Sequence, residues 1–120
     1  MADIRANNSY VVEDKAASYT ILPSDIGKIL VATAAATFTL PAIADVWNGW
    51  NVRIFNAVND VLVIAAPTDK LVTFNDIAGS SLTTTSGEHV GFGTQIVYDS
   101  ALTKYIDLRF QTEAVTVTVG

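Results

Sequence analysis

Apolar and polar residues alternate in three short segments between Ser18 and Ala42. Because successive side chains of a β-strand point to opposite faces, this pattern predicts strands with one face in a core. The alternating apolar positions are Tyr19, Ile21, Ile29, Val31, Phe38 and Leu40. The residues Ser-Asp-Ile-Gly at 24–27 predict a turn between the first two segments.

Short strands separated by Gly, Pro, Asn and Asp are expected along the whole chain. They are 9–12, 18–22, 28–33, 37–40, 51–56, 61–65, 71–74, 81–84, 88–92, 94–99, 103–110 and 114–119. The segment 57–60 is expected to close a hairpin between its neighbours, and 75–79 to be a turn. In 103–110, one face carries Lys104, Ile106, Leu108 and Phe110, and the other carries Tyr105, Asp107 and Arg109. The apolar strand 114–119 is expected to pair within a sheet or with another subunit.

A single helical turn is expected at 42–47, which is too short to stand alone. It would carry the chain across one end of the domain, where Trp47 and Trp50 would cap the core. Together these elements predict an all-β protein with a single domain at 18–120, an antiparallel jelly-roll-like sandwich or barrel. The polar segment 1–17 is interpreted as an N-terminal extended arm.

Composition narrows the class of protein further. A chain of 120 residues suits one domain with a real core. It has no cysteine, which excludes disulfides, thiolate metal sites and cysteine nucleophiles. The longest apolar run, 61–66, is far shorter than the roughly 20 residues that cross a bilayer. The first eight residues do not resemble a secretory signal, so synthesis in the cytoplasm without export is expected.

The formal charge is −5, from seven basic and twelve acidic residues, and the basic residues are scattered. Such a surface repels phosphate groups, so neither nucleic acid nor an anionic membrane is an expected partner.

No set of residues predicts catalysis. His89 is the only histidine, and no nucleophile motif such as Gly-x-Ser-x-Gly accompanies it. A cupin-type metal enzyme would need several histidines. Glu13 and Asp14 are adjacent, so on a strand they would point to opposite faces and could not share a proton. We expect no enzyme activity, and no catalytic, cofactor-binding or metal-binding residues.

Three further groups are interpreted as structural. Calcium could bind Asp69, Asn75 and Asp76, but their spacing fits no EF-hand loop. Gly87, Gly91 and Gly93 precede no predicted helix and are interpreted as turn and bulge glycines rather than a phosphate loop. Large aromatic residues can form a sugar-binding platform, and the alternative is a role in the core or at a subunit interface. The aromatic candidates are Trp47, Trp50 and Tyr98.

Several of these segments in order resemble the small β modules of tailed-phage virion proteins. They are Ser-Tyr-Thr-Ile at 18–21, Ser-Asp-Ile-Gly-Lys at 24–28, Thr-Phe-Thr-Leu-Pro at 37–41, Gly-Trp-Asn-Val-Arg-Ile-Phe-Asn at 49–56 and Ser-Gly-Glu at 86–88. Such modules occur in capsid decoration (cement) proteins, head fibres and tail fibres. The chain has no collagen-like or coiled-coil shaft, which favours a decoration protein over a fibre.

The resemblance implies a homotrimer that binds the major capsid protein on the outer surface of the virion capsid, between capsomers, and stabilises the shell. The arm would order on binding and add a strand to a neighbouring subunit. The alternative is a receptor-binding or carbohydrate-binding module of a head or tail fibre, with a host surface glycan as ligand.

Overall fold

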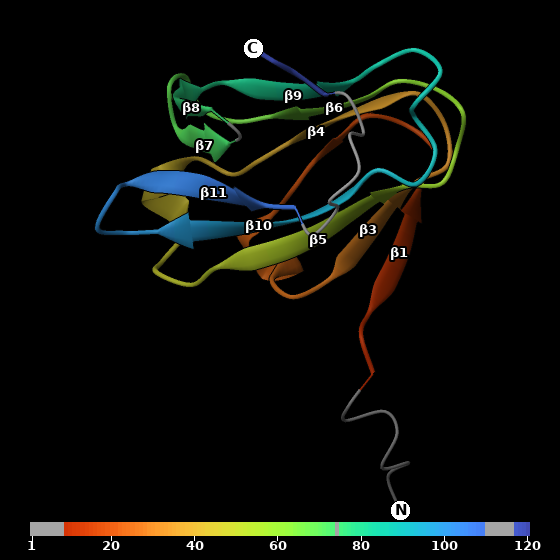
Figure 1. Cartoon of the computed structure of the whole chain (residues 1–120). Coiled ribbons are helices and arrows are strands. Elements are labelled where there is room, and N and C mark those ends of the chain that lie inside the picture. The colour runs from red at the N-terminus through yellow and green to blue at the C-terminus, as the bar shows by residue number, and fades with distance from the viewer. Residues whose placement is uncertain (1–8, 74, 110–116) are drawn as a thin grey trace, which may run out of the picture.

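In the computed structural model, the chain forms two β-sheets packed face to face in one domain (Figure 1). The structure describes residues 9–73, 75–109 and 117–120. Sheet A has the strand order β1-β3-β5-β10-β11-β7-β8, and sheet B has the order β12-β9-β6-β4-β2. The strands are β1 Val12–Lys15, β2 Tyr19–Thr20, β3 Ile29–Ala32, β4 Ala36–Thr39, β5 Asn51–Asn56, β6 Leu62–Ala65, β7 Leu71–Thr73, β8 Asp76–Gly79, β9 Ser81–Thr84, β10 Gly93–Asp99, β11 Lys104–Leu108 and β12 Val117–Val119. The predicted all-β single domain is confirmed.

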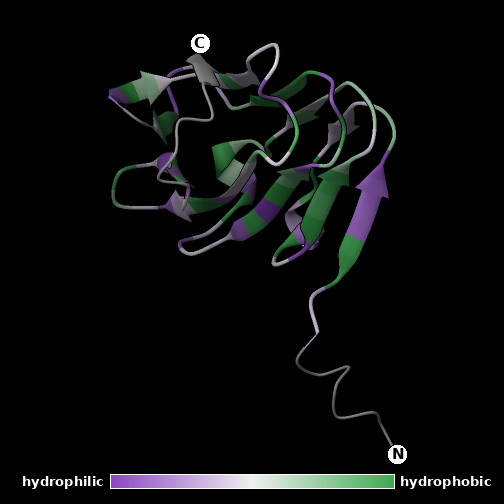
Figure 2. Cartoon of the chain, turned by 45° about the vertical axis from the view of Figure 1, so that its right-hand side comes forward, coloured by the Kyte–Doolittle hydropathy of each residue, from purple (hydrophilic) through white to green (hydrophobic). Residues whose placement is uncertain are grey.

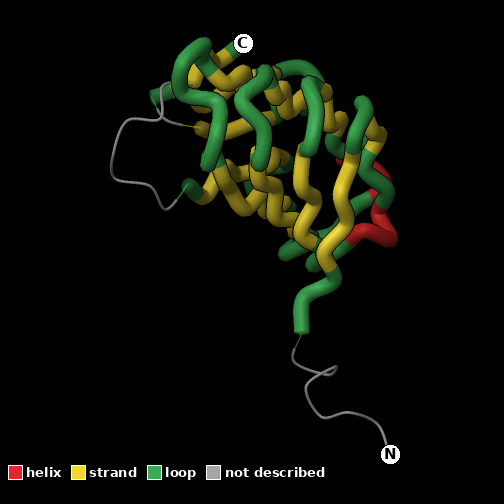
Figure 3. The backbone as a smooth tube through the Cα atoms, turned by 90° about the vertical axis from the view of Figure 1, so that its right-hand side faces the viewer, coloured by secondary structure: helices red, strands yellow, loops and turns green. Residues whose placement is uncertain are grey.

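In the first half of the chain, successive strands alternate between the two sheets, so the backbone crosses from one sheet to the other after every strand. Strands β1, β3 and β5 are parallel neighbours in sheet A, and β2, β4 and β6 are parallel neighbours in sheet B. Figure 3 shows connections between the layers lying side by side at one end of the molecule. The expectation of antiparallel pairing throughout is therefore wrong for this half, and a jelly-roll connectivity is not confirmed.

Antiparallel pairing dominates the second half. Strand β10 pairs with β5 and β11, β9 pairs with β6 and β12, and β7 pairs with β8. One parallel pair, β11 with β7, remains in sheet A. The later strands thus extend both sheets by pairing with the free edges of β5 and β6.

The hairpin predicted at 57–60 is wrong, because β5 and β6 belong to different sheets. The fully buried side chain of Asn56 shapes this crossing. Its amide donates to the carbonyl oxygens of Asp60, at 2.9 Å, and His89, at 3.0 Å. The Asp60 carboxylate in turn accepts from the amide of Val61. These bonds replace the turn bonds of a hairpin and direct the chain to the other layer.

Three other predicted boundaries differ from the structure. The expected turn 75–79 contains strand β8, and the expected strand 88–92 lies in loops and turns between β9 and β10. The first strand is Val12–Lys15 rather than 9–12, and it pairs in sheet A, so the interpretation of all of 1–17 as an extended arm is wrong for these residues. Residues 1–8 and 110–116, which include parts of the predicted arm and strands, lie outside the described residues.

Two short 3-10 helices complete the fold at one end of the sandwich. They are η2, Pro23–Asp25, and η3, Ile43–Asp45. The first confirms the predicted turn at 24–27, where Gly27 has a φ of 76° that favours glycine. The second confirms the single helical turn expected at 42–47.

The core lies between the two sheets. Its largest fully buried side chains are Trp50, Tyr105, Phe38, Phe92, Ile21, Leu30, Ile54, Leu62, Ile64, Leu71, Leu82 and Ile96. In β3 the buried residues are Leu30 and Ala32, whereas alternation predicted Ile29 and Val31. All four residues of β3 are apolar, so alternation does not determine which face is buried.

Candidate functional site

His89 is hydrogen-bonded to a buried threonine. Its Nδ1 lies 2.7 Å from Oγ1 of Thr84, and the same hydroxyl oxygen accepts a hydrogen bond from the amide of Leu62 at 3.0 Å. Thr84 is 4 % exposed. This hydroxyl is committed to holding the loop after β9 against β6, so the pair has a structural role.

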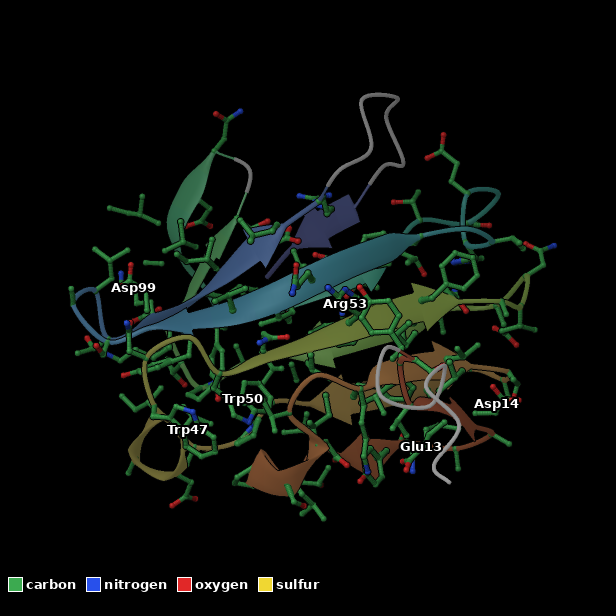
Figure 4. All side chains as sticks on the ribbon, turned by 90° about the horizontal axis from the view of Figure 1, so that it is seen from below. Glu13, Asp14, Trp47, Trp50, Arg53 and Asp99 are labelled. Atoms are coloured by element: carbon green, nitrogen blue, oxygen red, sulfur yellow. The ribbon has the colours of Figure 1, made fainter. Side chains whose placement is uncertain are left out.

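Glu13 and Asp14 point to opposite sides of β1, as predicted (Figure 4). Glu13 faces the Nζ atoms of Lys28, at 2.9 Å, and Lys15, at 3.3 Å. The hydrogen bonds from these lysines lower the pKa of Glu13. Glu13 is therefore part of an ion-pair network rather than a solvated charge at a strand end, and Asp14 is exposed on the other side.

The network continues to Asp25, which is 1 % exposed. Its carboxylate accepts from the Tyr19 hydroxyl at 2.7 Å, the Leu22 amide at 2.9 Å and Lys28 Nζ at 2.9 Å. Burial raises the pKa of Asp25, but these three donors outweigh it, so that the pKa lies below its ordinary value. The hydrogen bonds of Lys28 to Asp25 and Glu13 raise the pKa of Lys28. We call Glu13, Lys15, Tyr19, Asp25 and Lys28 the edge network, because it links the β1 edge of sheet A to the β2 edge of sheet B.

A second buried charge lies between the sheets at Asp107, whose side chain is 1 % exposed. It accepts from the hydroxyls of Thr73, at 2.7 Å, and Thr94, and Arg109 Nε lies 2.7 Å from its Oδ2. Arg109 also donates to the Thr73 hydroxyl at 3.1 Å. Every oxygen of this carboxylate is thus occupied by protein donors, so the cluster stabilises the fold and does not present a reactive group.

Local backbone structure accounts for the three residues considered as calcium ligands. Asp69 and Asn75 have φ angles of 61° and 59°, typical of turn positions, and Asp76 accepts from the amide of Ala78. Within residues 9–73, 75–109 and 117–120, no group of three or more His, Asp or Glu side chains could hold a metal ion. Gly87 and Gly91 have φ angles of 86° and 89° and lie in turns.

The three aromatic candidates do not form an exposed platform. Trp50 and Tyr98 are buried, and both make edge contacts with the ring of Tyr105, at 6.0 and 5.4 Å between centroids. The Trp50 indole donates to the carbonyl oxygen of Pro23 at 2.9 Å. Trp47 is 52 % exposed and does not cap the core, contrary to the prediction.

The feature that sequence reasoning missed is the outer face of sheet A, which points away from sheet B (Figure 4). Strand register places most of its side chains in three rows across the sheet, and Asp99 and Lys104 form a short fourth row. The first is Val12, Ile29, Arg53, Gln95 and Leu108, the second Asp14, Val31, Phe55 and Gly93, and the third Asn51, Val97, Ile106 and Val72. Most of these residues are apolar, so sheet A is apolar on both faces.

Several of the apolar residues are well exposed. Val12 is 58 % exposed, Phe55 41 % and Leu108 39 %. An open groove of about 430 Å³ runs between them. It is lined by Ile29, Val31, Arg53, Ile54, Phe55, Gly93, Thr94 and Gln95.

Gly93 keeps the groove open because it has no side chain on this face. A Cβ at this position would lie 3.3 Å from Cδ2 of Phe55, so the ring covers the glycine. Beside it, the guanidinium of Arg53 lies 4.4 Å from the centroid of the Tyr10 ring, a cation–π contact.

The sequence could have indicated this face. Ile29 to Ala32 are apolar at every position, and a strand with apolar residues on both sides is typical of a sheet covered on both faces. The outer face is therefore the candidate functional site, and its chemistry suits binding.

No protein-family model matches the chain, and a search of curated proteins finds no match. No helix in the described part of the chain has the length and apolar character needed to span a bilayer.

Proposed function

We propose that this protein is a phage capsid decoration (cement) protein, which binds the outer surface of the assembled shell between capsomers and stabilises it. The observation that carries the proposal is the apolar outer face of sheet A, which the described residues leave uncovered and which suits contacts within an assembly of several copies. Large apolar patches on soluble proteins mark interaction sites. The assignment to a phage virion comes from the resemblance of segments 18–28, 37–41, 49–56 and 86–88 to phage β modules.

The mechanism is a shift in an assembly equilibrium. A protein that binds only the assembled shell stabilises that state by mass action. Several linked copies bind more tightly than one, because each contact raises the effective concentration of the next. We propose three copies, bound to the major capsid protein, with no catalytic group and no cofactor involved.

The test is co-sedimentation of the purified protein with expanded phage capsids, followed by heating of the decorated capsids. Binding and a higher temperature of capsid disruption are expected. A protein that remains in the supernatant at all concentrations would refute the proposed function.

The N-terminal segment is proposed as an additional capsid contact. Since Val12–Lys15 is part of sheet A, the variant that tests it should lack residues 1–8 only and keep β1. Weaker capsid binding is expected, and unchanged binding by this variant would refute a role for the segment. The variant's circular dichroism spectrum controls for its fold.

A second function, binding of a host surface glycan, is favoured by the exposed indole of Trp47. The chain has two tryptophans, and Trp50 is fully buried, so a change in tryptophan fluorescence on adding glycan would report on Trp47. Glycan binding that Trp47→Ala removes, without capsid binding, would assign the protein to the adhesion class.

A further inference from the structure

We infer that the outer face of sheet A is the surface on which copies of this chain meet one another. The inference deepens the proposed function, and rests on it for the expectation of several copies. It commits to a second copy of this chain as the occupant of the face, rather than the capsid protein.

Sheet A has the composition of a sheet covered on both sides. Its inner face packs on sheet B through residues such as Leu30, Ile54 and Ile96. Its outer face presents Val12 and Phe55, which no other element covers among the described residues. Covering such a face removes apolar surface from water, which contributes about 25 cal/mol per Å².

The charges of the outer face favour a second copy as the partner. The whole chain has a net charge of −5, so two copies repel each other in most orientations. Among the described strand residues, this face carries two acidic residues, Asp14 and Asp99, and two basic residues, Arg53 and Lys104, so it has none of the chain's excess negative charge. Two copies meeting through this face therefore bring no excess charge together.

Two of these charges are complementary between copies. Arg53 lies near the middle of the sheet and Asp14 on its edge strand (Figure 4). Within the part of the chain that the structure describes, neither forms an ion pair. Where two copies meet through this face, Arg53 of one can contact Asp14 of its neighbour, which would fix the orientation of the contact.

The β1 edge of sheet A and the β2 edge of sheet B are less suitable for self-association. Strand β1 has the sequence Val-Glu-Asp-Lys and appears largely hydrophilic beside the apolar β3 (Figure 2). Charged residues on an edge strand oppose pairing with another strand. Strand β2, at the same edge of sheet B, has only two residues. Association through the face therefore fits this molecule better than association through these edges.

The experiment measures mass in solution by light scattering and sedimentation velocity, with no capsid present. The wild-type chain should form a defined oligomer. Val12→Glu and Phe55→Glu should weaken association about tenfold or more, because each places a charge in the buried contact. Val90→Glu is the matched control, since Val90 is 57 % exposed against 58 % for Val12 but lies in the loop before β10. Circular dichroism controls for folding.

A charge exchange tests the orientation. Arg53→Glu and Asp14→Arg should each weaken association, and the double variant that carries both should recover it. A wild-type chain that stays monomeric at every concentration would overturn the inference, and so would association that Val12→Glu and Val90→Glu reduce equally. Capsid binding by such a monomer would leave the proposed function standing, whereas an oligomer that ignores capsids would refute that function alone.

Discussion

At the scale of single residues, the Asp25 carboxylate joins three segments of the first half of the chain. It accepts hydrogen bonds from Tyr19 of β2, from Leu22 ahead of η2 and from Lys28 ahead of β3. A buried charge is stable only where donors replace the water it has lost. The three donors do so here, and in return the carboxylate fixes the first crossing from sheet B to sheet A.

Replacing this carboxylate by an amide should destabilise the protein near neutral pH. Asp25→Asn should lower the free energy of unfolding by about 1.5–3 kcal/mol, as expected for a hydrogen bond to a charged group. The pKa of Asp25 is lowered in the folded protein, so its contribution is present above the unfolded value of about 3.9 and is lost as pH falls through the folded value. Urea unfolding from pH 7 to pH 2 measures this.

The difference between wild type and Asp25→Asn should therefore shrink in acid. Asp69→Asn is the matched control, because Asp69 is exposed and the left-handed backbone of its turn also suits asparagine. A difference between wild type and Asp25→Asn that stays constant down to pH 2 would show that the charge of Asp25 does not stabilise the fold.

The contribution of Tyr19 to stability should be lost at high pH rather than in acid. Its hydrogen bond to Asp25 raises its pKa to about 12 in the folded protein. Its contribution is present below the unfolded value of about 10 and is lost as pH rises through about 12. Tyr19→Phe should be less stable than wild type at pH 8, and the two should converge in thermal melts as pH approaches 12. A gap that widens with pH would contradict this prediction.

Asp107 and Arg109 form a buried ion pair, and removing one charge should destabilise the protein more than removing both. Asp107→Asn leaves the guanidinium, whose side chain is 17 % exposed, without its carboxylate and should cost about 3–5 kcal/mol. The double variant Asp107→Leu/Arg109→Met removes both charges and should cost less than the single one. Guanidinium chloride unfolding of the wild type and the two variants tests this, and a double variant that is as unstable as Asp107→Asn, or less stable, would contradict it.

At the scale of elements, the edge network determines how β1 joins the sheet. Lys28 bridges Glu13 of β1 and Asp25 of η2, while Lys15 lies 3.8 Å from the centroid of the Tyr19 ring. The backbone adds the amide of Ile29, which donates to the carbonyl oxygen of Val11. The side chains thus hold an edge strand that backbone bonds secure on one side only.

Removing the bridging lysine should loosen this edge. Lys28→Met should lower Tm by several degrees, because it leaves the buried Asp25 without its cation, and should speed hydrogen exchange in β1. Lys70→Met is the control, since Lys70 forms no ion pair with the described residues. Exchange in β1 that equals the wild-type rate would show that the backbone alone holds the strand.

Strand positions could be predicted from this sequence, but strand partners could not. Asn51–Asn56 and Ser81–Thr84 match their predicted ranges because alternation and turn residues are local signals. A four-residue connection such as 57–60 can close a hairpin or cross between layers. Here the difference depends on Asn56, whose partners include the distant His89 carbonyl oxygen, which no local pattern reveals.

The candidate site could not be predicted from the alternation of apolar and polar residues either. In β11 the residues that point into the sandwich include Tyr105 and Asp107, while Ile106 and Leu108 lie on the outer face. A strand face that is covered by another subunit has the same pattern of apolar residues as a face that is covered within the chain. The sequence shows that one side of such a strand is buried, but burial between subunits and burial within the chain look alike.

At the scale of the whole molecule, self-association through the outer face should couple stability to concentration. A folded state that binds further copies is stabilised by mass action, so the Tm of the wild-type chain should rise with protein concentration. The Tm of Phe55→Glu should not. Differential scanning calorimetry over a hundredfold range of concentration measures both, and a Tm of the wild type that does not change would contradict association.

The alternation of β1 to β6 between the two sheets also determines when each strand can pair during synthesis. On the ribosome, β3 emerges after its partner β1, β4 after β2, β5 after β3 and β6 after β4. Each new strand therefore finds its neighbour already made, and the nascent chain can lengthen both sheets together. Once Ala65 has emerged from the ribosome, the nascent chain should thus already carry two short paired sheets, with the free edges of β5 and β6 open to the strands still to come.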